Sequence, residues 1–214
     1  MALFGHLFFS PKVTNDDQLG TAIEASVDRL QRLRLQFFDG CVRVLSLEPL
    51  VQKSPFVRSN ADFALRGFQF RLLTNHVGTN RYVSRELFEK LVDTFPSRMA
   101  AGDGATPEGT EESAEKIWSY ASEFMRCSDT DEMLATVASN VALFLSRRST
   151  GSADLLLSTR LSGRIFPYGM FLALNVFLIA EDLFGTDKAR LKFLRRRNDV
   201  FNQLGDFYGL QSFS

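Results

Sequence analysis

The side chains that most often carry chemistry in proteins are few in this chain and lie far apart. His6 and His76 are the only histidines, and Cys41 and Cys127 are the only cysteines. None of the four has the spacing at which histidine and cysteine bind zinc, so we expect no metal and no cofactor. We interpret the cysteines as small buried residues of a reducing compartment, although the sequence leaves a disulfide between them open. His76 is predicted to cap the end of a helix.

Other patterns that resemble catalytic motifs have simpler interpretations. The segment AAGDGATPEG lacks the Gly-Lys-Ser/Thr ending of a phosphate-binding loop. Ser113 and Lys116 match the S-x-x-K pattern of penicillin-recognising enzymes, but no K-T-G follows, and a solvated helix face explains them better. Glu181 and Asp182 are adjacent, so on a helix they diverge, which indicates caps and solubilising charges. We therefore predict that the protein is not an enzyme. A site assembled from scattered Arg, Asp and Tyr residues is the enzymatic alternative.

Two groups of basic residues are better candidates for a functional surface. The last predicted helix is amphipathic and basic, and such a helix binds anionic lipid headgroups, an acidic protein or a phosphate backbone. The simpler interpretation is a solvated face, balanced by the acidic segment 108–115. The candidate contact residues are Lys188, Arg190, Lys192, Arg195, Arg196 and Arg197. A second basic group, on the first helix, consists of Arg29, Arg32, Arg34 and Arg43.

The elements that carry these residues are predicted to be helices, because apolar residues recur at helical spacing along most of the chain. The first helix is predicted to begin at Asp16 or Asp17 and to run to about Glu48, where Pro49 ends it. The second is predicted from Asn60 to His76, with Gly78 as its stop.

The second half of the chain continues this pattern. A third helix is predicted from Ser84 to the residue before Pro96, followed by a flexible loop at 100–110. Glu111 and Glu112 are expected to open the fourth helix, and Asp129 with Glu132 resembles the capping box of a fifth. A short helix, an apolar helix and a final amphipathic helix after residue 186 complete the prediction.

The apolar run over 164–184, RIFPYGMFLALNVFLIAEDLF, has the strongest structural signal. Its uninterrupted part is shorter than the roughly 20 apolar residues of a membrane span, and polar residues break it. A buried helix fits it better. The predicted fold class is all-α, a single multi-helix bundle with a central apolar helix.

Composition indicates an ordinary globular protein. A chain of 214 residues with 45% hydrophobic and 23% charged residues is expected to form one domain. We predict an apolar arm at 1–15, without the basic start of a secretory signal, and an all-helical domain at 16–214. The 21 phenylalanines are expected in the core or in an exposed docking patch. The net charge of zero disfavours a dedicated nucleic-acid binder.

Three short segments resemble the thylakoid formation proteins, helical factors of photosystem II biogenesis. Residues 163–174, GRIFPYGMFLAL, match a family segment at Arg164, Phe166, Gly169, Phe171 and Leu174. Residues 61–67, ADFALRG, keep the Phe-Ala-Leu of a second family segment but lack its Asp-Pro and its following glycine. Residues 13–16, VTND, are similar to the family's T-V-x-D opening. The family's early Thr-Arg-Pro is missing, and its long charged C-terminal helix is short here.

This resemblance implies a non-enzymatic assembly or scaffold factor at the periphery of the thylakoid membrane. It implies protein partners, namely an FtsH-type membrane protease or photosystem subunits, with the basic residues of the last helix contacting them or an anionic membrane surface. The expected location is intracellular, at the thylakoid membrane under the resemblance and cytoplasmic without it. The alternative is a helical protein that coats nucleic acid through its basic helix faces.

Overall fold

The computed structural model describes residues 12–46, 55–79, 83–101, 106–124, 132, 136 and 155–185. In these ranges the chain forms five long helices and no strand. The helices are α2 (Asp16–Ser46), α3 (Pro55–Gly78), α4 (Arg85–Ala101), α5 (Pro107–Phe124) and α7 (Leu155–Phe184). The prediction of an all-α fold is confirmed. Three predicted parts lie wholly or mostly outside the described residues: residues 1–11 of the arm predicted at 1–15, the helix that Asp129 was predicted to open, apart from residues 132 and 136, and everything after 185.

Helix α2 begins one residue earlier than a cap at Asp16 would place it, because Asn15 is the cap. The Oδ1 atom of Asn15 accepts a hydrogen bond from the backbone N–H of Gln18 at 2.9 Å. The side chain of Gln18 in turn accepts one from the backbone N–H of Thr14 at 2.8 Å. Asp16 and Asp17 fall in the first turn, where a negative charge favours the positive end of the helix dipole.

Two prolines begin helices earlier than the sequence predicted. Helix α3 begins at Pro55, five positions before Asn60, and α5 begins at Pro107, ahead of Glu111. Proline suits the first helical position because the N–H that it lacks has no intrahelical acceptor there. At α5, the hydroxyl of Thr106 accepts a hydrogen bond from the backbone N–H of Gly109 at 3.3 Å and caps the helix.

The prediction that Pro96 ends the third helix is wrong. Helix α4 starts after the predicted cap, Ser84, whose hydroxyl accepts the N–H of Leu87 at 3.3 Å, but it continues through Pro96 to Ala101. An interior proline removes one hydrogen bond and costs about 3 kcal/mol. Pro96 is buried together with Phe95 and Met99. Burial of this stretch against the other helices offsets the lost bond, which local sequence does not reveal.

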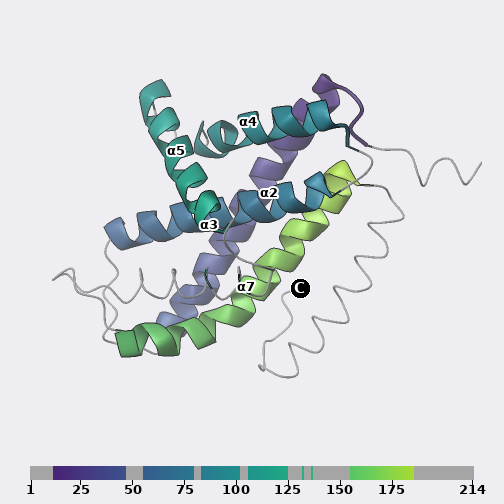
Figure 1. Cartoon of the computed structure of the whole chain (residues 1–214). Coiled ribbons are helices and arrows are strands. Elements are labelled where there is room, and N and C mark those ends of the chain that lie inside the picture. Colours follow the sequence, from purple (N-terminus) through teal and green to yellow (C-terminus); the bar gives the residue numbers. More distant parts are fainter. Residues whose placement is uncertain are drawn as a thin grey trace, which may run out of the picture.

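The helices form two crossing layers with α5 at one end (Figure 1). Helices α2 and α7 pack side by side as one layer. Helices α3 and α4 cross them, and α5 packs against both α3 and α4. α3 contacts all four other helices, and it is buried over most of its second half. α7 contains the predicted apolar run over 164–184, but it begins at Leu155, so the short helix and the apolar helix that the sequence predicted are one continuous element. It packs against α2 and α3.

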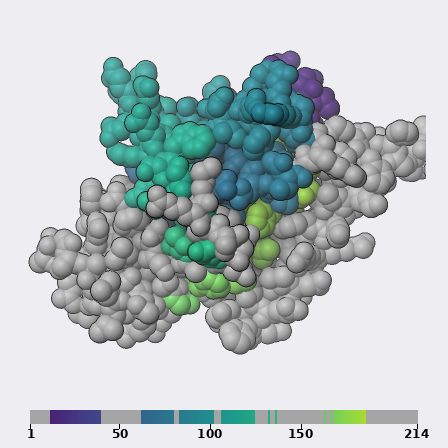
Figure 2. Space-filling view, in the orientation of Figure 1, coloured from purple at the N-terminus to yellow at the C-terminus, as the bar shows by residue number. Residues whose placement is uncertain are grey.

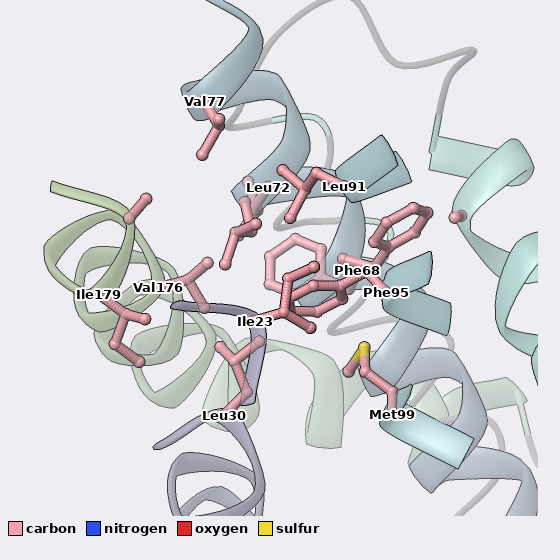
Figure 3. Packing of buried hydrophobic residues seen from close by; sticks show 14 of the residues in the cluster. Ile23, Leu30, Phe68, Leu72, Val77, Leu91, Phe95, Met99, Val176 and Ile179 are labelled. Carbon is pink, nitrogen blue, oxygen red and sulfur yellow. The ribbon is translucent and has the colours of Figure 1, made fainter. Parts of the chain in front are cut away.

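The core lies where the two layers meet. Figure 3 shows side chains from α2, α3, α4 and α7 converging on it. The labelled ones are Ile23, Leu30, Phe68, Leu72, Val77, Leu91, Phe95, Met99, Val176 and Ile179. Many phenylalanines were expected in the core, and this is confirmed for the described residues; Phe68, Phe70, Phe95, Phe124 and Phe184 are almost fully buried.

Helices α3 and α5 touch main chain to main chain at Gly67. A Cβ atom at Gly67 would lie 2.6 Å from the Cβ of Tyr120 and 2.8 Å from the backbone nitrogen of Ala121. No side chain fits between the helices at this point, so glycine is required. The contact fixes α5 against α3.

Candidate functional site

The basic residues predicted to contact a partner or a membrane lie outside the described residues. They are Lys188, Arg190, Lys192, Arg195, Arg196 and Arg197. Their role stays a prediction. The search for a site therefore turns to the polar groups and the hollows of the described helices.

The basic group on α2 is not a continuous solvated face. The side chain of Arg34 is buried, with 6% of its surface exposed. Arg29 forms an ion pair with Asp182 of α7, whereas Arg32 donates a long hydrogen bond of 3.4 Å to the carbonyl of Asp28. The side chain of Arg43 lies outside the described residues. Of the three arginines that can be placed, two point toward neighbouring helices.

Arg34 enters a buried polar network between α2 and α3. Its Nε atom donates to one carboxylate oxygen of Asp62 at 2.6 Å, and the Nε atom of Arg66 donates to the other at 2.7 Å. Arg34 also donates to the side-chain oxygen of Gln69 at 3.3 Å. One carboxylate thus holds two arginines from two helices, and these charge-assisted bonds are among the stronger ones in proteins.

The same network also includes main-chain carbonyls of α2 and α4. The amide of Gln69 donates to the carbonyl of Leu30 at 3.0 Å, and Arg66 donates to the carbonyl of Met99 at 2.8 Å. Helices α2, α3 and α4 are therefore tied together by polar contacts inside the core. Buried polar groups with partners of this kind specify one helix arrangement over others.

The adjacent carboxylates of α7 bind different partners, as their divergence on a helix predicts. They are not solubilising charges, however. The Oε1 atom of Glu181 lies 2.6 Å from Nε2 of His76 on α3, and only 15% of the Glu181 side chain is exposed. Asp182 pairs with Arg29, and its carbonyl accepts a hydrogen bond from Lys12 at 2.8 Å.

His76 also differs from its predicted role as a helix cap. Its ring pairs with Glu181 and lies against the ring of Phe177, with centroids 5.2 Å apart. The hydroxyl of Thr79 donates to the carbonyl of His76 at 2.9 Å and supplies the cap instead. The histidine thus joins α3 to α7.

The S-x-x-K pattern lies on the outer side of α5. Lys116 forms a 2.6 Å hydrogen bond with Glu112, one turn earlier, and its ammonium lies over the ring of Phe63. The hydrogen bond from Lys116, with its positive charge, lowers the pKa of the exposed Glu112 carboxyl. These contacts are those of a helix surface pair rather than of an activated nucleophile.

A cleft between α3, α4 and α5 is the best candidate for a binding site. Its volume is about 350 Å³, within the range of small ligand pockets. Figure 2 shows the surfaces of these helices, in blue and teal, adjoining on one face of the molecule. The cleft is lined by Phe70, Arg71, Thr74, Asn75, Gly78, Thr79, Phe88, Val92, Trp118 and Ala121.

Aromatic side chains form the rigid part of the cleft. The indole of Trp118 meets the ring of Phe70 edge to face, with centroids 5.0 Å apart. Phe70 stacks in turn on Phe95 at 5.9 Å. Trp118 is nevertheless 36% exposed, and among the described residues only Leu35 is a more exposed large hydrophobic side chain. Such a supported and accessible indole is typical of a binding anchor.

Phe88 of α4 packs against the end of α3 and forms part of the wall of the cleft. A Cβ atom at Gly78 would lie 3.0 Å from the ring of Phe88. The missing side chain lets the ring approach closely. Gly78, predicted only as a helix stop, therefore also shapes the cleft.

Arg71 is the polar group of the cleft that needs explanation. Its Nε atom is buried and has no hydrogen-bond partner in the described part of the chain. A buried donor without an acceptor costs about 1–3 kcal/mol. Asn75 lies one helical turn further along the same wall, where residues four apart are neighbours. The cleft thus combines apolar walls with a cation that lacks an acceptor.

Sequence reasoning missed this cleft because no local pattern marks it. Arg71 is one of many arginines, and Trp118 comes from a helix 47 positions later, as their numbers show. The one available signal was that the chain has a single tryptophan, on a helix with a largely polar sequence.

The described residues contain no cluster of three or more His, Cys, Asp or Glu side chains that could hold a metal ion. Over the same ranges, no helix combines the length and the apolar character that crossing a membrane requires. Comparison of the chain with protein-family models, with curated proteins and with solved structures gives no match.

Proposed function

We propose that this chain is a non-enzymatic helical assembly or scaffold factor that holds a protein partner in the cleft between α3, α4 and α5. The observation that carries the proposal is the lining of the cleft. It places the exposed indole of Trp118 beside the apolar side chains of Phe88 and Val92 and the cation of Arg71. Tryptophan and arginine are the residues most enriched at the centres of protein interfaces.

The charged groups inside the fold support a scaffold role. His76 and Glu181, which have the side chains of an acid–base pair, bind each other across α3 and α7. Asp62 binds two arginines across α2 and α3. These groups position helices, and a rigid set of helices suits a protein whose task is to present a surface.

The resemblance to thylakoid formation proteins supplies a specific setting for this proposal. Two of its three segments lie on α3 and α7, which pack against each other. In that setting the partner is an FtsH-type membrane protease or a photosystem subunit, and the protein works at the periphery of the thylakoid membrane. The basic residues at 188–197 then contact the anionic membrane surface or an acidic partner.

Site-specific photo-crosslinking in native cells tests the cleft. A photoreactive residue replaces Thr79, which is exposed at the edge of the cleft, or Leu35, which is 52% exposed on α2, as the control. We expect a protein adduct from position 79 that Trp118→Ala abolishes, and no such adduct from position 35. An adduct that Trp118→Ala leaves unchanged, or no adduct from position 79, contradicts the proposal.

Separate measurements test the thylakoid setting and the alternative of a protein that coats nucleic acid. Mass spectrometry of the adduct identifies the partner, and a membrane protease or a photosystem subunit supports the thylakoid setting. Recovery of nucleic acid that disappears at high salt would favour the coating protein instead. Reversing the six charges at 188–197 is expected to weaken membrane or partner association, and unchanged association would remove that contact.

A further inference from the structure

Arg71 determines which chemistry completes the cleft. Arg71 lines the cleft with a guanidinium that is always charged and that forms no ion pair with a described residue. A carboxylate is the protein group that matches this donor best, because it carries the opposite charge and fits the planar guanidinium fork. The neighbouring amide of Asn75 offers a second donor on the same wall.

The other walls determine what the carboxylate must be attached to. Phe88 and Val92 of α4 and Trp118 of α5 present apolar surface to the same space. A free inorganic anion would leave that surface without a contact. The complementary group is therefore a large apolar side chain next to the carboxylate.

From this complementarity we infer that the cleft binds an acidic–apolar segment of a partner protein, in which an Asp or Glu lies beside a large apolar residue. The acidic side chain pairs with the guanidinium of Arg71, and the apolar side chain packs against Trp118. This inference rests on the proposed scaffold function and adds the chemistry of the partner. Arg71 is the residue that confers specificity, and Trp118 is the anchor.

The single tryptophan of the chain makes this testable, because its fluorescence reports from inside the cleft. The probes are two N-acetylated, C-amidated peptides that differ in one atom group, Ser-Glu-Leu-Leu-Ser and Ser-Gln-Leu-Leu-Ser. The full chain is titrated with each, to about 1 mM or above, since a short segment binds weakly. We expect the Glu peptide to bind at least tenfold more tightly than the Gln peptide.

Variants of Arg71 assign the preference to its guanidinium. Arg71→Gln is expected to remove the difference between the two peptides, and Arg71→Lys to keep only part of it, because lysine lacks the planar fork. The matched control is Arg85→Gln, which removes an arginine whose side chain is 91% exposed and outside the cleft. This control is expected to keep the full preference.

The thermal stability of the free protein separates a binding role from a structural one. Arg71→Gln is expected to leave Tm unchanged or to raise it, because the wild-type Nε atom has no partner to lose in the described structure. A lowered Tm together with equal affinity for both peptides in the wild type would overturn the inference.

The inference can also fail while the proposed function stands. In that case, the crosslink from position 79 would depend on Trp118 but survive Arg71→Gln, and the wild type would bind the Glu and Gln peptides equally. Loss of the crosslink in wild-type cells, by contrast, rejects the scaffold proposal itself. Fluorescence that does not respond to either peptide also counts against the inference.

Discussion

His76 and Glu181 lie 105 positions apart in the chain, yet their Nε2 and Oε1 atoms are 2.6 Å apart. The pair connects the end of α3 to the end of α7, and the ring of Phe177 covers the imidazole on one side. This contact orients α7 relative to α3, the helix that contacts the other four.

A double-mutant cycle measures what the pair contributes. His76→Ala, Glu181→Ala and the double variant are compared by chemical denaturation. Because both side chains are mostly buried, we expect a coupling free energy of about 1 kcal/mol or more. Arg98 and Glu24, which form an exposed pair at 3.3 Å, are the control and are expected to couple more weakly. Equal coupling in the two cycles would contradict the prediction.

Asp62 is predicted to be the most sensitive of the charged residues described here. Arg34 and Arg66 have largely buried side chains, and Asp62→Ala removes the carboxylate that accepts the hydrogen bonds of their Nε atoms. We expect the free energy of unfolding to fall by about 3–5 kcal/mol. Glu89→Ala is the control, because Glu89 pairs with Arg85 on the surface, and its Tm should match the wild type. A similar Tm for both variants would show that the network contributes little.

Gly67 and Gly20 form a matched pair for the contact between α3 and α5. Gly67→Ala places a Cβ atom 2.6–3.0 Å from atoms of α5, and we expect it to destabilise the fold by about 1–3 kcal/mol. Gly20 lies in α2 with no atom within 4 Å of its would-be Cβ, so Gly20→Ala should stabilise by about 0.5–1 kcal/mol. Urea denaturation is expected to show a lower free energy of unfolding for Gly67→Ala and a higher one for Gly20→Ala. An unchanged free energy for Gly67→Ala would contradict the close contact between α3 and α5.

The titration of Glu112 is predicted to depend on Lys116. The hydrogen bond and positive charge of Lys116 lower the pKa of the Glu112 carboxyl in the folded state. A lowered folded pKa means that the pair stabilises the fold above the ordinary pKa of a glutamate. That stabilisation is lost as the pH falls through the lower folded value. Carboxyl NMR should show the low pKa in the wild type and the ordinary one in Lys116→Met. An unchanged pKa in that variant would assign the shift to another cause.

Local signals were enough to predict that the described ranges are helical, but not where each helix begins and ends or how its polar residues are used. The periodicity of apolar residues, the cap at Ser84 and the stop at Gly78 are properties of short segments, and the structure confirms them. The passage of α4 through Pro96 depends on burial against other helices. The side chain of Arg34 points inward because its Nε atom donates a hydrogen bond to the carboxylate of Asp62, 28 positions later.

The candidate site was less predictable still. Its walls come from three helices. The Nε atom of Arg71 is buried without a partner because of how α3 packs against the other helices, which the sequence does not show. The basic residues at 188–197, which the sequence favoured, are an independent prediction that the described structure does not test. Charge patterns along a chain indicate surfaces that attract anions in general. A cleft that selects one anion requires the fold.

The main-chain contact at Gly67 has a consequence for how the cleft would bind. Side chains between helices can change rotamer and let the helices move, but backbone atoms in contact cannot. Arg71 lies one turn from Gly67 on α3, while Trp118 and Ala121 lie within a turn of the contact on α5. The cation and the indole are therefore held at a set separation before any partner arrives. Binding does not require the two helices to rearrange. Because the site is already ordered, little of the binding free energy is spent on ordering it.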